Sequence, residues 1–174
     1  MNFSIDQDLT VRGKILPALD VLHKEHVITR TLLLSLCLQS PFIPHGREEL
    51  TAKALWFGFE GDFGTAIHLL TPQLEHVIRI CLKANGAHTT HLDQSGIETE
   101  KGLSSLLDTP EAEELFGEDH LFELKAVLTS TYGSNLRNEV AHGLLNDDSS
   151  CSIPTVYAWS VSYTQLTLPT KRIV

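Results

Sequence analysis

Three side chains with different chemistry fall close together in residues 137–143, which read RNEVAHG. The imidazole of His142 can take a proton from a ribose 2′-hydroxyl, or give one to a leaving oxygen, near neutral pH. The guanidinium of Arg137 can hold phosphate oxygens through paired N–H donors and stabilise charge in a transition state. The amide of Asn138 can orient a ribose or the imidazole. This combination suits the breaking of a phosphodiester bond, and it needs no metal ion.

A helix must carry these side chains if they are to act together. Successive residues of an α-helix are ~100° apart, which spreads Arg137, Asn138 and His142 over ~140° on one side, with Asn138 and His142 close enough to touch. We expect this helix to cover residues 134–145, to be capped by one of its first two residues, and to favour an anion at its N-terminus. The residues expected to face the core are Leu136, Val140, Gly143 and Leu144.

The same side chains could instead be ordinary surface residues of a helix. Arg137 could then pair with Glu118 or Glu139, and His142 could bond to a backbone carbonyl. Spacing alone leaves both interpretations open, because polar residues on the outer face of a helix are common.

A second polar group lies in residues 63–84, the segment with the strongest helical period of the chain. Glu75 and Arg79 are four residues apart, so an ion pair along the helix surface is expected between them. Glu75 could also orient His142 or Arg137, which would make Glu75 and Arg79 supporting residues of the site.

Other candidate metal or redox groups are weaker. His88 and His91 lie beside Asp93, but in a polar segment where solvated histidines are the simpler interpretation. The three cysteines are far apart and form no CxxC pair, so neither a zinc site nor a disulfide framework is expected: Cys37, Cys81 and Cys151. We expect no metal and no cofactor.

The composition limits the classes of protein to which the chain can belong. With 174 residues, of which 42% are hydrophobic and 20% charged, it is long enough for one globular domain with a core. No apolar run approaches the ~18 residues of a membrane span, and residues 1–8 lack the features of a signal peptide, so we expect a cytoplasmic protein. The net charge of −9 argues against a broad nucleic-acid surface, so RNA chemistry would need a local site and no DNA partner is predicted.

Apolar periodicity and breaker residues predict an all-α domain of residues 1–161. Pro17 is expected to kink or restart the first helix, Gly117 to separate two helices, and residues 88–98 to form a loop or short hairpin. The expected helices are 11–25, 26–39, 47–59, 63–84, 103–107, 111–116, 118–131, 134–145 and one from Pro154 onward. Of these, 26–39 is expected to be buried.

Residues 162–174 (SYTQLTLPTKRIV) differ from the rest of the chain. They show no evident helical period and resemble the conceptual translation of a sequencing adapter. We therefore expect a non-native tail that cuts the C-terminal helix short, with the natural protein continuing past Val161. The alternative is a C-terminal strand rich in Thr and Leu.

Residues 137–143 resemble the HEPN superfamily (higher eukaryotes and prokaryotes nucleotide-binding). Arg137 and His142 match its Arg-x4-His motif, and together with Asn138 and Gly143 they match the RNxxxHG signature of a family of unknown function within it. The similarity covers roughly residues 56–159, including 69–79 and 91–107. That family is similar to the endoplasmic reticulum membrane-associated RNA degradation protein of animals, and bacterial members look like defence or toxin-type proteins.

The resemblance implies a helical bundle that forms a homodimer, in which two such motifs meet in one metal-independent endoribonuclease site. It implies that His142 is the acid or base, Arg137 the phosphate clamp and Asn138 the positioning residue, in defence or RNA turnover. Some HEPN domains instead only bind a nucleotide or a partner protein. A non-catalytic binding module and a purely structural or regulatory helical domain therefore stay open as alternatives.

Overall fold

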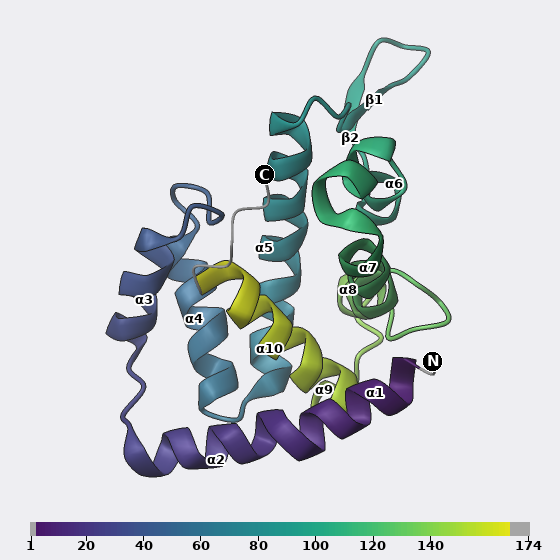
Figure 1. Ribbon diagram of the computed structural model, residues 1–174. Helices are drawn as coiled ribbons and strands as arrows, with labels where there is room; N and C mark the ends of the chain where they lie inside the picture. Colours follow the sequence, from purple (N-terminus) through teal and green to yellow (C-terminus); the bar gives the residue numbers. More distant parts are fainter. Residues whose placement is uncertain (1–2, 168–174) are drawn as a thin grey trace.

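The computed structural model describes residues 3–167, which are mainly helical with one small antiparallel sheet (Figure 1). The all-α prediction is confirmed. The elements are α1 Phe3–Thr10, the π-helical turn η1 Val11–Ile15, α2 Leu16–Glu25, α3 Arg30–Gln39, α4 Glu48–Phe59, α5 Phe63–Ala84, β1 Thr90–Leu92, β2 Glu98–Glu100, α6 Leu103–Leu107, α7 Pro110–Leu128, α8 Leu136–Ala141, α9 Asp147–Ser150 and α10 Ile153–Thr167. No described helix is both long enough and apolar enough to cross a membrane.

Helix α5 is the central element, with α3 and α4 on one side and α6, α7 and α8 on the other (Figure 1). Its predicted bounds are confirmed at both ends. Asp62 caps the first turn, because its Oδ1 accepts a hydrogen bond of 3.0 Å from the N–H of Thr65. Asn85 and Gly86 end the helix, and Gly86 has the left-handed φ of +88° that favours glycine.

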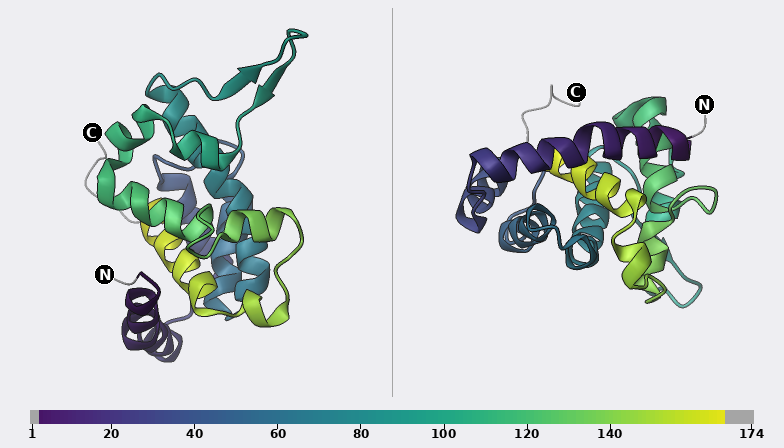
Figure 2. Two further views of the ribbon diagram at one scale, coloured as in Figure 1. Left: turned by 90° about the vertical axis from the view of Figure 1, so that its right-hand side faces the viewer. Right: turned by 90° about the horizontal axis from the view of Figure 1, so that it is seen from below.

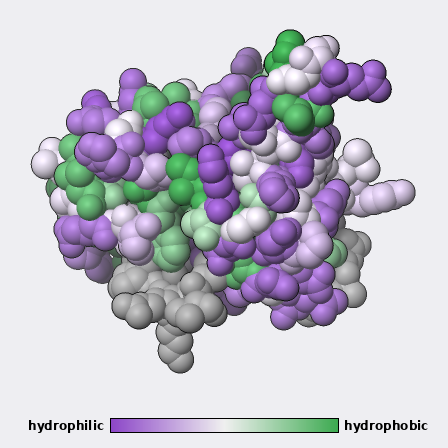
Figure 3. Space-filling model, turned by 90° about the horizontal axis from the view of Figure 1, so that it is seen from above, coloured by the Kyte–Doolittle hydropathy of each residue, from purple (hydrophilic) through white to green (hydrophobic). Residues whose placement is uncertain are grey.

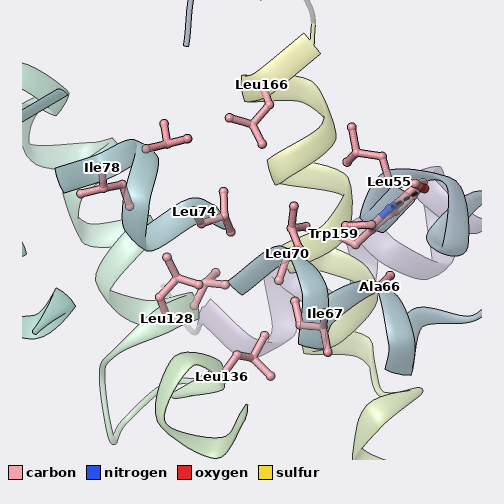
Figure 4. Close-up of a cluster of buried hydrophobic side chains, with 14 of the residues drawn as sticks. Leu55, Ala66, Ile67, Leu70, Leu74, Ile78, Leu128, Leu136, Trp159 and Leu166 are labelled. Carbon is pink, nitrogen blue, oxygen red and sulfur yellow. Dashed lines mark hydrogen bonds between the residues drawn. The ribbon is translucent and has the colours of Figure 1, made fainter. Parts of the chain in front are cut away.

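Helix α10 belongs to the core because it inserts Trp159 between α4 and α5 (Figure 4). Trp159 is only 2% exposed, and its indole N–H donates to the carbonyl of Leu55 at 3.1 Å. The indole also packs edge-on against the ring of Phe59, with centroids 4.9 Å apart. Gly58 makes room for it, since a Cβ there would lie 2.1 Å from the indole nitrogen.

The expectation that α10 is cut short at Val161 is wrong, as is the alternative of a strand, because α10 continues to Thr167. The hydroxyl groups of this Ser- and Thr-rich sequence find hydrogen-bond partners within the helix. Ser162 Oγ donates to the carbonyl of Ala158 at 2.6 Å, and Thr164 and Thr167 make the same bond four residues back. Leu166 is buried in the core. The non-native origin of 162–174 stays a prediction, and residues 168–174 lie outside the described residues.

The N-terminal helices α1, η1 and α2 form one rod that runs past the end of the bundle (Figures 1 and 2). Pro17 starts α2, as predicted, because it lacks an N–H and cannot continue the preceding ladder. The register shifts just before it: the N–H of Leu16 donates to the carbonyl of Val11, five residues back.

Helix α3 departs from the prediction in two ways. It begins at Arg30 rather than at residue 26, because Thr29 Oγ1 accepts from the N–H of Leu32 and caps the helix there. It was also expected to be buried, but within it only Leu33 and Cys37 are.

On the face shown in Figure 3, hydrophobic residues form small patches among hydrophilic ones, which is ordinary for a protein surface.

The chain between α5 and α8 follows the predicted breaks. Strands β1 and β2 pair as an antiparallel hairpin that projects from the helices (Figures 1 and 2), so of the two predicted alternatives, a loop or a short hairpin, the hairpin forms. Gly117 has φ +72° and ψ +162°, which divides α7 into two helical segments, as expected.

Candidate functional site

Helix α8 is shorter than predicted and carries only the first part of the motif. It starts after Asn135, which has a left-handed φ of +47°, and ends at Ala141. His142 is therefore the C-terminal cap residue and lies outside the helix. The expected continuation to residue 145 is wrong.

Gly143 explains the early end of α8. Its φ is +65°, its N–H donates to the carbonyl of Val140 at 3.2 Å, and the N–H of Leu144 donates to the carbonyl of Glu139 at 2.8 Å. These two bonds form a Schellman motif, for which glycine is the favoured residue. The expectation that Gly143 and Leu144 face the core is wrong, because both are exposed beyond the helix end, while Leu136 is buried (Figure 4).

Arg137 and Asn138 are held by a chain of side-chain hydrogen bonds. Arg137 Nε donates to Glu75 Oε2 at 2.9 Å, and Arg137 Nη1 donates to Asn138 Oδ1 at 3.1 Å. Asn138 Nδ2 in turn donates to Asn135 Oδ1 at 2.8 Å. The ionic partner of Arg137 is thus a residue of α5, rather than Glu118 or Glu139 as the surface interpretation expected.

Glu75 joins two arginines. Its Oε1 accepts from Arg79 Nη2 at 2.9 Å, so the ion pair expected along α5 forms, while its Oε2 accepts from Arg137. Arg79 Nη1 also donates to Glu100 Oε2 at 2.9 Å and to the carbonyl of Lys101 at 2.7 Å. The side chains of Glu75, Arg79 and Arg137 are 18%, 14% and 27% exposed. This Glu75 cluster (Glu75, Arg79, Glu100 and Arg137) connects α5, α8 and the base of the hairpin.

His142 is not connected to the Glu75 cluster. It is exposed, and in the described part of the chain its ring takes part in no hydrogen bond or ion pair. The side-chain amide of Asn138 bonds to Asn135 and Arg137. The hydrogen bonds of the motif therefore do not include the expected contact between Asn138 and His142. The imidazole is therefore free to exchange a proton with a molecule in solution, while the guanidinium four residues before the helix end is fixed.

A second histidine lies beside the Glu75 cluster and has a perturbed titration. The pKa of His76 is lowered, first by burial and then by the positive charges of Arg47 and Arg79, while Glu100 acts in the opposite direction. The lowered pKa favours the neutral imidazole. Neither this histidine nor Glu100 was predicted to belong to the site. An acidic residue paired with a basic helix residue 21 positions away carries no local sequence signal.

The histidines and the aspartate that were the weaker metal candidates lie in and beside the hairpin. Asp93 Oδ1 accepts from the N–H groups of Ser95 and Ile97, at 2.8 and 2.9 Å, and so shapes the tip of the hairpin. Residues 3–167 contain no group of three or more His, Cys, Asp or Glu side chains that could hold a metal ion. The three cysteines are free thiols.

Comparison with known proteins adds no family to this description. No family model, no curated protein and no solved structure matches the chain. The site therefore rests on its own chemistry: a fixed guanidinium and amide on a short helix, and an exposed imidazole at the end of that helix.

Proposed function

We propose that the chain is a metal-independent endoribonuclease of the HEPN type, with its site on α8. One observation carries this proposal: Glu75 and Asn138 hold the Arg137 guanidinium in place, while His142 at the other end of α8 is exposed with no partner among the described residues. A fixed cation can position a phosphate, and an accessible imidazole can move protons near neutral pH.

The reaction would be transfer of a phosphodiester to the neighbouring 2′-oxygen. The 2′-hydroxyl loses its proton to a base as its oxygen bonds to phosphorus, the P–O5′ bond breaks, and the 5′-oxygen receives a proton from an acid. The products are a 2′,3′-cyclic phosphate and a 5′-hydroxyl. A homodimer that brings two α8 sites together would supply one imidazole for each proton transfer, His142 and the partner's His142.

Arg137 would bind the phosphate through the N–H groups that do not donate to Glu75 or Asn138. Nε and Nη1 are already used, which leaves Nη2 and the second proton of Nη1, and the side chain is 27% exposed. Glu75 would thus act as a positioning residue that orients the guanidinium.

A non-catalytic nucleotide- or protein-binding module is the second candidate, and the charge of the chain favours it. The net charge is −9, and both arginines of the Glu75 cluster are paired with carboxylates. These charges weaken long-range attraction of a polyanion.

Cleavage of a single-stranded RNA in the presence of EDTA tests the proposal. The substrate is an oligoribonucleotide, compared with the same oligonucleotide carrying one internal 2′-deoxy residue. We expect cleavage that leaves a 2′,3′-cyclic phosphate, and no cleavage after the 2′-deoxy position. His142→Ala should be inactive, whereas His120→Ala, which removes another exposed histidine, should stay active.

Two results would contradict the proposal: equal cleavage by His142→Ala and the parent, or cleavage after the 2′-deoxy position. The binding module is tested separately by calorimetric titration of the parent protein with ribonucleotides. Saturable binding without cleavage would favour the module over the enzyme.

A further inference from the structure

A pocket of about 420 Å³ opens where the C-terminal end of α7 and the α7–α8 turn face α6, and its lining includes Tyr132, which precedes the motif in the chain. Its volume lies within the ~300–1,000 Å³ range of small-molecule sites in proteins. The residues that carry the argument are Ser104, Asp108, Phe122, Lys125, Thr131 and Tyr132, which all line it.

The lining combines aromatic rings with donors that suit a nucleotide. Tyr132 is fully exposed and Phe122 mostly exposed, although large aromatic side chains are usually buried. Phe3 holds the Phe122 ring edge-on, with centroids 5.9 Å apart. The hydroxyls of Ser104 and Thr131 make no hydrogen bond within residues 3–167. Exposed rings beside free polar groups are the elements with which proteins stack and bond to unpaired bases.

Lys125 adds a positive charge to the same pocket. Its ammonium lies 2.7 Å from Asp108 Oδ1, in a pair whose acidic partner is 70% exposed. An ion pair with so exposed a carboxylate contributes little to stability, so little opposes an exchange of the carboxylate for a phosphate.

A backbone hydrogen bond connects the pocket to the segment that leads into α8. The N–H of Ser134 donates to the carbonyl of Ala126, a pocket residue, at 2.9 Å. Gly133 allows this approach, since a Cβ there would lie 2.0 Å from the same carbonyl oxygen. Tyr132 precedes Arg137 by five residues, which span at most ~18 Å. A single strand of RNA could therefore contact both residues.

We propose that this pocket binds a base of single-stranded RNA next to the phosphate at Arg137, with Tyr132 and Phe122 as the stacking platform and Lys125 on a flanking phosphate. The inference rests on the proposed function in taking RNA as the ligand and Arg137 as a phosphate contact. It assigns to the enzyme a base subsite outside the RNxxxHG residues.

The test uses the full chain with His142→Ala, so that RNA is bound without turnover. The probe is a short fluorescein-labelled oligouridylate at low salt, read by anisotropy. Adding Tyr132→Ala should weaken binding about fivefold or more, because one stacked base contributes that much, whereas Tyr132→Phe should keep the affinity. Leu92→Ala, which trims an exposed apolar side chain on the hairpin, is the matched control and should change nothing.

A second pair of variants tests the phosphate contact. Asp108→Asn frees Lys125 and should tighten binding by up to about fivefold, the effect of one unit charge near contact distance in water. Asp20→Asn removes the same charge from the pair that Asp20 makes with Lys24 at 2.5 Å on α2, and should have a much smaller effect.

These outcomes separate the subsite from the catalytic proposal. Binding that depends on Tyr132 in a protein that never cleaves RNA would support the subsite and contradict the enzyme. Cleavage that depends on His142 and is unchanged by Tyr132→Ala would support the enzyme and overturn the subsite. No binding of the oligonucleotide, or equal losses in Tyr132→Ala and Leu92→Ala, would also overturn the subsite.

Discussion

Replacing Glu75 by Gln tests whether this carboxylate holds the motif in place. The substitution keeps the size of the side chain and removes its negative charge, on which two guanidinium groups depend. An amide has one acceptor oxygen, so the new side chain could accept from Arg79 or from Arg137 and would place an N–H group toward the other.

The expected loss follows from the exposure of the three side chains. A hydrogen bond to a charged group contributes ~1.5–3 kcal/mol to stability when it is buried. Exposed fractions of 14–27% leave some solvent at the Glu75 cluster, so we expect Glu75→Gln to lower the free energy of unfolding by ~1–3 kcal/mol. For a chain of this length that corresponds to a fall in Tm of about 2–12 °C.

Denaturant unfolding followed by tryptophan fluorescence measures the change, since Trp159 is buried. The matched control is Glu49→Gln, which breaks the pair of Glu49 with Arg30, whose side chains are 66% and 51% exposed, and should cost only ~0–1 kcal/mol. In a double-mutant cycle, Glu75→Gln and Arg137→Gln should couple by ~0.5–3 kcal/mol. Equal losses in Glu75→Gln and Glu49→Gln, with no coupling to Arg137, would show that Glu75 does not hold Arg137 in place.

Three further substitutions test the fold and the titration of the site. Gly58→Ala places a methyl group where Trp159 lies and should cost ~2–4 kcal/mol, with a red shift of tryptophan emission; unchanged emission would contradict the packing of α10. Gly143→Ala, at φ +65°, should cost ~1–2 kcal/mol, while Gly13→Ala, where a methyl group meets open space, should not destabilise; similar costs would argue against the Schellman ending of α8. The pKa of His76 is lower in the folded protein than its ordinary value of 6.5. The contribution of His76 to the free energy of unfolding is therefore complete above pH 6.5 and is lost as the pH falls through the folded pKa. The free energy of unfolding should therefore drop as the pH falls below 6.5 toward the lowered folded pKa, and His76→Gln should reduce that drop; an identical pH dependence in both proteins would contradict this assignment.

Local signals in the sequence predict most of the helical framework. The bounds of α5 follow from its apolar period, the cap at Asp62 and the stop at Asn85. Pro17 marks the start of α2, and Gly117 divides α7, because each residue restricts the backbone wherever it occurs. These features depend only on neighbouring residues, so the sequence alone contains them.

The end of α8 has a local signal that can be interpreted in two ways. A glycine seven residues after Leu136 fits the apolar stripe of a long helix, but it also fits the left-handed position after a helix end. Leu144, an apolar residue directly after Gly143, is typical of the second case, and the hydrogen bonds of Gly143 and Leu144 decide for it. Because the helix ends before Gly143, His142 is the C-terminal cap residue and does not lie on the helix face.

The partner of Arg137 could not be predicted, because 62 residues separate it from Glu75. Carboxylates closer in the sequence, Glu139 above all, were the natural candidates, and only the packing of α8 against α5 selects Glu75. The helical part of the tail was missed for another reason. Ser162 and Thr164 satisfy their hydroxyls on carbonyls four residues back, which composition does not reveal.

We propose that the α8 site cleaves RNA with its own side chains and that His142 moves a proton. The most direct test is to incubate purified full chain and its His142→Ala variant with single-stranded RNA in EDTA and to follow the products. We predict cleavage by the parent protein and none by the variant, with the same thermal unfolding for both. Cleavage at the same rate by both proteins, or by neither, would contradict the claim.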